Sequence, residues 1–268
     1  MSGPERNGNF TNQELMVIEA ARHIQDGNVV LVGTGLPMVA TTFAQKSHAP
    51  NCICVVESGP IAPEVIPTPI SVSDPKIMHR AVRLGSKREV LGCILQRGLV
   101  DVGFLGGAQI DQFGNINTTV IGDYRKPTRR LPGSGGANDV ASHSKRILII
   151  TRHEKRRFPA HCDYITSPGY LFGPEGRQKA GLPVTTPPIT IVTDLTVMEI
   201  TRESRTMQVI KLMPGIQLSS VLDNLQFTPA VSPHLTEVEL PTAEQIRILR
   251  EEVDPSGVYL KRDGRAGE

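Results

Sequence analysis

The chain has 268 residues, which is enough for one large α/β domain with a sizeable core. Its 29 Lys and Arg residues against 27 Asp and Glu residues leave a formal charge of +2, so the charge gives no reason to expect nucleic acid or an anionic membrane as a partner. No stretch approaches the roughly 20 apolar residues of a membrane span, and the first residues show no apolar signal segment.

The four cysteines show no C-x-x-C pair and no zinc-type spacing with histidine. The seven histidines form no H-x-x-x-H pair either. From these spacings we expect free thiols, no metal site and a reducing, cytoplasmic location.

The first third of the chain alternates between helix and strand patterns. After a polar tail at residues 1–10, the TNQE sequence of residues 11–14 is a capping box followed by apolar residues at helical spacing. The NVVLVGTGLP sequence of residues 28–37 predicts a buried strand that runs into a glycine-rich turn. A second helix is expected over about residues 38–47, and the ICVV sequence of residues 53–56 predicts the next strand. This order predicts a mostly parallel sheet covered by helices.

Three further apolar runs predict buried strands: residues 100–107, 146–152 and 189–200. The last run is either a strand pair or one long strand. Residues 241–255 predict a helix with a second capping box. The stretch at 181–190 is the only linker-like one and is too short to demand a second domain, so we expect one domain over residues 11–258 and a polar tail at 259–268.

Glu57 directly follows the strand predicted at residues 53–56. An ionised carboxylate is costly to bury unless it is paired or has a function. A lone glutamate is more often paired with a basic neighbour or caps a helix. The carboxyl ends of strands, however, are where open α/β sheets bind ligands. Both interpretations of Glu57 therefore stay open at this point.

Two glycine-rich stretches, at residues 106–124 and 131–139, follow the predicted strands. Glycine adopts backbone angles closed to other residues, so the second stretch is either a surface turn or a source of N–H groups for an anion. The GTGLP sequence of residues 33–37 lacks the lysine and the spacing of a phosphate-binding loop. The basic run at 152–158, with Arg125, Lys126, Arg129 and Arg130 upstream, is either a solvated face or a clamp for phosphates.

Several short motifs stand in a fixed order along most of the chain. They are VLVGTGLP (30–37), VVESG (55–59), GGAQID (106–111), FGNIN (113–117), IGDY (121–124), GSGGAN (133–138), HEKRRF (153–158), TSPG (166–169) and REEVDP (250–255). In this order the sequence resembles the B (beta-type) subunits of class I CoA-transferases of the glutaconate CoA-transferase type.

The resemblance implies an α/β, CoA-transferase-like (NagB/RpiA-type) fold with an open, mostly parallel sheet covered by helices. It implies coenzyme A as co-substrate, no tightly bound cofactor and an A-type partner subunit, because fused CoA-transferases carry both halves. Glu57, at the position of the family nucleophile, would attack the thioester and form an anhydride that keeps the acyl group activated. The other candidate site residues are Gly135 and Gly136 as oxyanion donors, and Gly107, Gln109 and Asn117 as contacts to substrate or CoA.

The acid that receives CoA is expected to be a dicarboxylate such as glutaconate, although the sequence at 60–75 departs from that of the glutaconate enzyme. Arg80, Arg83 and the basic run at 155–157 are candidates for its counter-charge. An acyl-CoA hydrolase or decarboxylase on the same fold is the alternative activity. A non-catalytic subunit is a third alternative, against which the intact ESG sequence at 57–59 argues.

Overall fold

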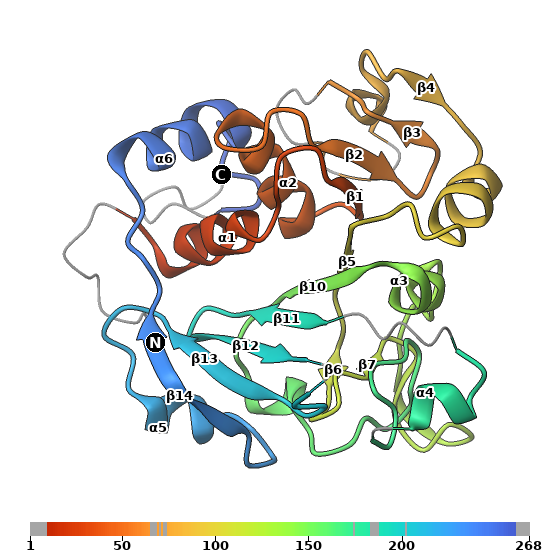
Figure 1. Cartoon of the computed structure of the whole chain (residues 1–268), viewed down its shortest axis with the longest axis vertical. Coiled ribbons are helices and arrows are strands. Elements are labelled where there is room, and N and C mark those ends of the chain that lie inside the picture. The colour runs from red at the N-terminus through yellow and green to blue at the C-terminus, as the bar shows by residue number, and fades with distance from the viewer. Residues whose placement is uncertain are drawn as a thin grey trace.

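The structure is a computed structural model, and it describes residues 10–64, 69, 71, 74–173, 175–182, 188–201 and 203–260. The two predicted tails therefore lie outside the described residues, except for Phe10, Tyr259 and Leu260. The main element is a ten-stranded sheet with the order β14-β13-β12-β11-β10-β5-β1-β2-β3-β4 (Figure 1). Its five central strands run parallel: β2 (Ile53–Val56), β1 (Val29–Val32), β5 (Val102–Leu105), β10 (Arg146–Ile150) and β11 (Ile189–Val192).

Antiparallel strands extend this parallel centre on both sides. On one side β12 (Thr196–Ile200) and β13 (Gln208–Leu212) follow β11, and β14 (Ala230–Glu237) then pairs parallel to β13. On the other side β3 (Pro60–Ile61) and β4 (Arg83–Leu84) follow β2. The run at 189–200 is thus a strand pair, and the predicted mostly parallel sheet is confirmed at its centre.

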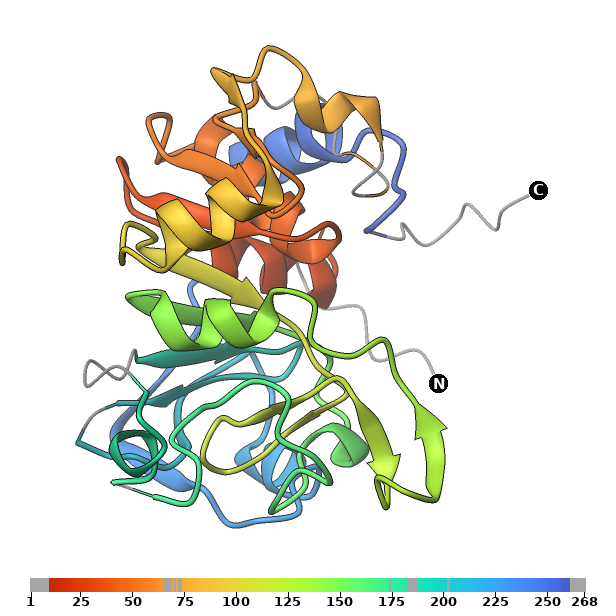
Figure 2. The same ribbon diagram turned by 90° about the vertical axis from the view of Figure 1, so that its right-hand side faces the viewer.

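Two small ribbons lie outside the main sheet. The first pairs β6 (Gln109–Ile110) with β7 (Ile116–Asn117), and the second pairs β8 (Val120–Gly122) with β9 (Pro127–Arg130). The β8–β9 ribbon, light green in Figure 2, projects from the edge of the fold. Its base lies next to the glycine-rich loop at 133–136, because the N–H of Gly133 donates to the carbonyl of Thr118 at 2.8 Å.

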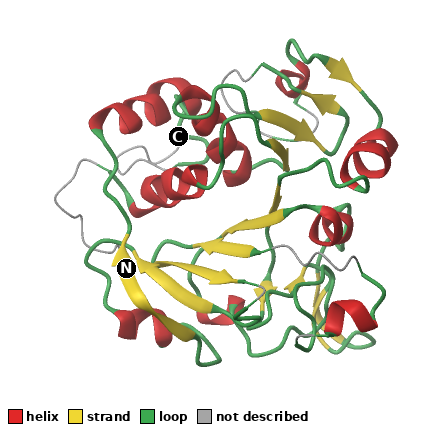
Figure 3. Ribbon diagram, in the orientation of Figure 1, coloured by secondary structure: helices red, strands yellow, loops and turns green. Residues whose placement is uncertain are grey.

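Helices lie on both sides of the sheet (Figure 3). One face packs against α1 (Asn12–Arg22), α2 (Leu36–Lys46) and the C-terminal segment formed by α6 (Ala243–Arg247) and a π-helical stretch (Ile248–Val253). The other face packs against α3 (Ala137–His143), α5 (Leu218–Leu222) and a π-helical stretch at Glu89–Leu95. The remaining helical turns are α4 (Gly176–Lys179) and the 3₁₀ turns Pro75–Met78 and Lys155–Arg157. Within the described ranges, no helix is both long and apolar enough to cross a membrane.

Local sequence signals explain where the helices begin. Both predicted capping boxes are present: the N–H of Glu14 donates to Thr11 Oγ1 at 3.2 Å, and the N–H of Gln245 donates to Thr242 Oγ1 at 3.1 Å. The helix α2 begins two residues before the predicted start at 38, because Pro37 has the backbone angle of a first helical turn and loses no hydrogen bond there.

The alternation of side chains along the central strands determines toward which face of the sheet Glu57 is directed. Val30, Val32, Cys54 and Val56 pack toward α1 and α2, whereas Leu31 and Val55 pack toward α3 and the stretch Glu89–Leu95. Since successive side chains alternate between faces, residue 57 is directed to the same face as Val55. The predicted free thiols are confirmed; that of Cys54 is buried, and burial raises its pKa to about 12.

Candidate active site

Glu57 lies in the turn that leaves β2, at the edge of the sheet where the parallel strands end. Its side chain is 32% exposed. The N–H of Gly59 donates to the carbonyl of Val56 at 2.9 Å and closes the turn. Gly59 has a φ of +131°, and an added Cβ would lie 2.1 Å from the carbonyl oxygen of Gly85. Only glycine therefore fits where the chain after Glu57 meets the end of β4.

Lys87 is the cationic partner of Glu57. Its Nζ contacts Glu57 Oε1, and the lysine side chain is 57% exposed. The N–H of Gly85 donates to the carbonyl of Gly59 at 3.0 Å, and this bond brings residues 85–87 beside the turn that carries Glu57. Lys87 is not among the residues predicted from the sequence, because its approach to Glu57 depends on the hairpin β3–β4, which has no sequence signal.

The glycine loop lies against the other side of the same carboxylate. An added Cβ at Gly136 would lie 3.1 Å from both Cδ and Oε2 of Glu57, and one at Gly135 would lie 3.8 Å from Oε1. The backbone of Gly136 therefore packs directly on the carboxyl group. In the part of the chain that the structure describes, neither glycine N–H donates to a protein acceptor. Neither N–H is therefore committed to a protein acceptor among the described residues.

Side-chain hydrogen bonds hold this loop and the helix behind it. Asn138 Nδ2 donates to the carbonyl of Thr166 at 3.0 Å, and Thr118 Oγ1 donates to the carbonyl of Gly133 at 2.8 Å. Arg177 is 3% exposed, and its guanidinium donates to the carbonyl oxygens of Ala141, Ser142, Pro168 and Gly169. Burial lowers the pKa of Arg177. Arg177 thus ties the end of α3 to the TSPG loop, so that the start of α3 is held against Glu57.

The other candidates, Gly107, Gln109 and Asn117, lie in and around the β6–β7 ribbon. Gln109 donates to Asp163 Oδ2 at 3.0 Å, and Asn117 donates to Gln109 Oε1 at 2.7 Å and to the carbonyl of Val120 at 2.6 Å. At Gly107 an added Cβ would lie 2.3 Å from Ile116 Cγ2. The contacts observed for these three residues are internal and shape the loops behind the glycine loop. Their role as contacts to substrate or CoA stays a prediction.

Some of the basic residues proposed from the sequence are paired with protein groups: the counter-charge candidates Arg80 and Arg83, and three residues of the predicted phosphate clamp. Arg80 pairs with Glu64 at 2.7 Å, and Arg83 pairs with Glu89 at 2.7 Å. Glu154 accepts from two further arginines, Arg156 and Arg157. In the β8–β9 ribbon, the guanidinium of Arg130 lies 4.5 Å from the centre of the Tyr124 ring. A free anion would therefore compete with these protein partners for the guanidinium groups.

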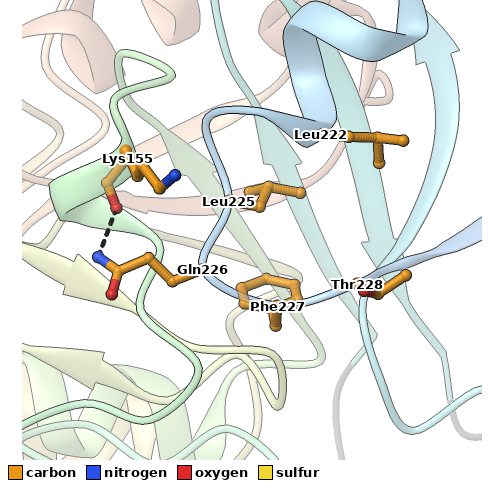
Figure 4. Close-up of a pocket in the computed structure, with 6 residues that line it drawn as sticks. All are labelled: Lys155, Leu222, Leu225, Gln226, Phe227 and Thr228. Atoms are coloured by element: carbon orange, nitrogen blue, oxygen red, sulfur yellow. Dashed lines mark hydrogen bonds between the residues drawn. The ribbon is translucent and has the colours of Figure 1, made fainter.

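Lys155 lines a shallow cavity of about 420 Å³ beside α5. Figure 4 shows its six lining residues, Lys155, Leu222, Leu225, Gln226, Phe227 and Thr228. The amide of Gln226 donates to the carbonyl of Lys155 at 3.0 Å. Glu57 is not part of this cavity. Among the described residues, no group of three His, Cys, Asp or Glu side chains is arranged to hold a metal ion.

Comparison with known proteins identifies the family. The sequence model of the coenzyme A transferase family matches residues 14–224. The chain belongs to the coenzyme A transferase family. It is 37% identical over 257 residues to the B subunit of glutaconate CoA-transferase from Acidaminococcus fermentans, covering 94% of this chain and 96% of that protein. It is 39% identical over 241 residues to the B subunit of 3-oxoadipate CoA-transferase from Pseudomonas knackmussii, covering 90% and 92%.

The fold agrees with this assignment. The crystal structure of the glutaconate enzyme from Acidaminococcus fermentans matches with a TM-score of 0.89 at 36% identity, covering 95% of this chain and 98% of that one. The decarboxylase AibA/AibB matches with a TM-score of 0.81 at 24% identity, which shows a shared fold alone. The predicted family, α/β fold and enzyme class of this CoA-transferase chain are therefore confirmed.

Proposed function

We propose that the chain is the B-type subunit of a CoA-transferase that moves CoA between carboxylic acids, and that Glu57 is its nucleophile. One observation carries this assignment. The carboxylate stands at the exit of a central parallel strand, with its two oxygens between the ammonium of Lys87 and the backbone of Gly136. Such a carboxylate is fixed in position and open to a ligand from the carboxyl edge of the sheet.

The chemistry follows from the carboxylate. One oxygen of Glu57 attacks the thioester carbonyl, the carbon–sulfur bond breaks, and a mixed anhydride and CoA thiolate result. The thiolate then attacks the glutamyl carbonyl, which releases the first acid and leaves CoA as a thioester on Glu57. The carboxylate of the acceptor acid then attacks the glutamyl thioester, and the same two steps proceed in reverse to form the new acyl-CoA. These steps balance without a further cofactor, so we propose CoA as the co-substrate and no tightly bound group.

The backbone N–H groups of Gly135 and Gly136 are the proposed oxyanion donors. A Cβ added at Gly136 would lie 3.1 Å from Cδ of Glu57, so this loop lies next to the carbon that carries the oxyanion when CoA thiolate attacks the glutamyl carbonyl. A donor of this kind is worth about 10²- to 10³-fold in rate. The asparagine and arginine contacts that hold α3 and the TSPG loop fix these donors before the reaction begins.

An A-type subunit is proposed as the partner that completes the site. A glutamyl anhydride is destroyed by water, yet in this chain the side chains of Glu57 and Lys87 keep 32% and 57% of their surface exposed. A second surface must therefore cover them during turnover. The B-type relatives support a partner of the A type. Cysteines that are all free support a cytoplasmic location within this proposal.

Activity should therefore depend on the partner. We expect the purified chain to show no CoA transfer between two carboxylic acids, and the same chain co-expressed with an A-type subunit to be active. Thiol release without transfer to an acceptor, or carbon dioxide release, would instead identify the hydrolase or decarboxylase activities. Robust transfer by the chain alone would contradict the proposal that this chain carries only part of the active site.

We also propose that the acceptor carries a second carboxylate. Glutaconate and 3-oxoadipate, the acids in the names of two relatives, are both dicarboxylates. With acetyl-CoA as donor, glutarate should exceed butyrate by at least about tenfold in kcat/KM, a difference of about 1.4 kcal/mol. Equal or better use of butyrate would contradict the dicarboxylate preference, while transfer to either acid would leave the CoA-transferase assignment intact.

A further inference from the structure

The two oxygens of the Glu57 carboxylate have different surroundings. Oε1 contacts the ammonium of Lys87, whereas Oε2 faces the backbone of Gly136. Within the described residues, Lys87 has no second carboxylate within ion-pair distance. The lysine charge is therefore directed at the group that reacts and at no other acidic side chain there.

During the proposed first step the negative charge passes from Glu57 to the sulfur of CoA, and Lys87 remains beside the reacting carboxyl group. Before the step the negative charge is on Glu57. When the glutamate oxygen bonds to the acyl carbon, the electron pair of the breaking carbon–sulfur bond goes to the sulfur of CoA. No proton is transferred. The anhydride is neutral, so Lys87 has lost its partner at the moment when a thiolate appears. That thiolate must stay beside Cδ of Glu57, because it attacks this carbon next.

We propose that Lys87 is a further catalytic residue, whose ammonium passes from the Glu57 carboxylate to the departing CoA thiolate and back. This inference rests on the proposed function of Glu57. An exposed ion pair alone adds little to stability, so a purely structural Lys87 would be nearly dispensable. A lysine that stabilises the leaving thiolate has a different signature, because its effect depends on how basic that thiolate is.

The test compares Lys87→Met with wild type in the complex formed with an A-type subunit. Two donors carry the same acyl group: an acyl-pantetheine, whose leaving group is a basic alkyl thiolate, and an acyl 4-nitrothiophenyl ester, whose leaving group is a weakly basic aryl thiolate. Consumption of the donor thioester is measured in a single turnover without acceptor, because the thiol itself ends as a thioester on Glu57. Lys87→Met should slow the pantetheine ester at least about tenfold and the aryl ester no more than about twofold. Lys87→Arg keeps the charge and should recover most of the loss.

Lys145→Met is the matched control. Lys145 pairs with Asp101 at 2.8 Å, and the two side chains are 60% and 27% exposed, close to the values for Lys87 and Glu57. Lys145 and Asp101 directly precede β10 and β5, so this pair lies at the amino-terminal ends of the parallel strands, opposite to the ends that carry Glu57. The control should leave both rates unchanged. The ratio between the two donors is taken on one preparation, so partial unfolding of a variant cancels.

An equal loss with both donors, or no loss, would overturn the assignment to Lys87. If Lys87→Met incubated with an acyl-CoA still accumulates CoA on Glu57, the nucleophile stands whatever the ratio is. If wild type itself forms no covalent species on Glu57, the proposed function fails and the inference on Lys87 falls with it.

Discussion

Replacing Glu57 by glutamine should lower CoA transfer by at least about 10³-fold in the partner-bound enzyme. The amide has nearly the shape of the carboxylate but no charge with which to attack a thioester. The side chain is half-buried in a turn closed by backbone bonds, so the fold should survive. The measurement is kcat/KM for transfer from acetyl-CoA, with the mass of the variant checked to exclude deamidation back to glutamate.

Glu89→Gln is a suitable control for this substitution. Glu89 also pairs with a basic residue, Arg83, at 2.7 Å, and it is 28% exposed against 32% for Glu57. Loss of this pair should change transfer by no more than about twofold, because an exposed ion pair contributes little. Wild-type turnover by a folded, partner-bound Glu57→Gln enzyme would show that another group attacks the thioester.

The second large effect is expected from Gly136→Val. Gly136 has a φ of −85°, which valine also adopts, so the substitution tests space and not backbone strain. An added Cβ would lie 3.1 Å from Glu57 Cδ and 3.2 Å from Leu91 Cδ1. Either the carboxylate or the loop must move, and a displacement of about 1 Å can cost about 100-fold in rate. We expect kcat to fall by that order while partner binding persists.

Gly92→Val provides the comparison for Gly136→Val. Gly92 lies in the neighbouring π-helical stretch, and an added Cβ there would meet nothing within 4 Å. If a folded Gly136→Val complex turns over as fast as the Gly92→Val complex, the glycine loop contributes only to the fold and the oxyanion donors lie elsewhere.

The sequence was sufficient to place Glu57 but not its partner. Four aliphatic or thiol side chains at residues 53–56 predict a buried strand, and a charged residue at its exit falls where parallel sheets bind ligands. Lys87 lies 30 positions further along the chain, and its contact depends on a hairpin of two-residue strands, β3 and β4. Strands this short have no periodicity to recognise. The decisive fit, a glycine at 59 against the backbone of Gly85, is visible only in three dimensions.

Polar residues within the motifs were harder to interpret. Gln109 and Asn117 lie in a glycine-rich sequence typical of a ligand site, yet both side chains are buried and hydrogen-bonded to protein groups. A buried amide needs partners whether or not a ligand is present, so the residue type alone does not separate the two roles. The role of Arg177 could not be predicted for the opposite reason: an arginine is expected to be exposed, and this one is 3% exposed because four carbonyl groups accept its hydrogen bonds.

The most direct test of the central claim is the mass of the peptide that contains Glu57. The chain in complex with an A-type subunit is incubated with an acyl-CoA in the absence of acceptor, quenched, digested and analysed by mass spectrometry. A covalent nucleophile predicts that this peptide gains the mass of CoA minus one water, that fragmentation places the gain on Glu57, and that a carboxylic acid acceptor removes it. A complex that transfers CoA yet carries the adduct on another residue, or carries none at any time during turnover, would contradict the account.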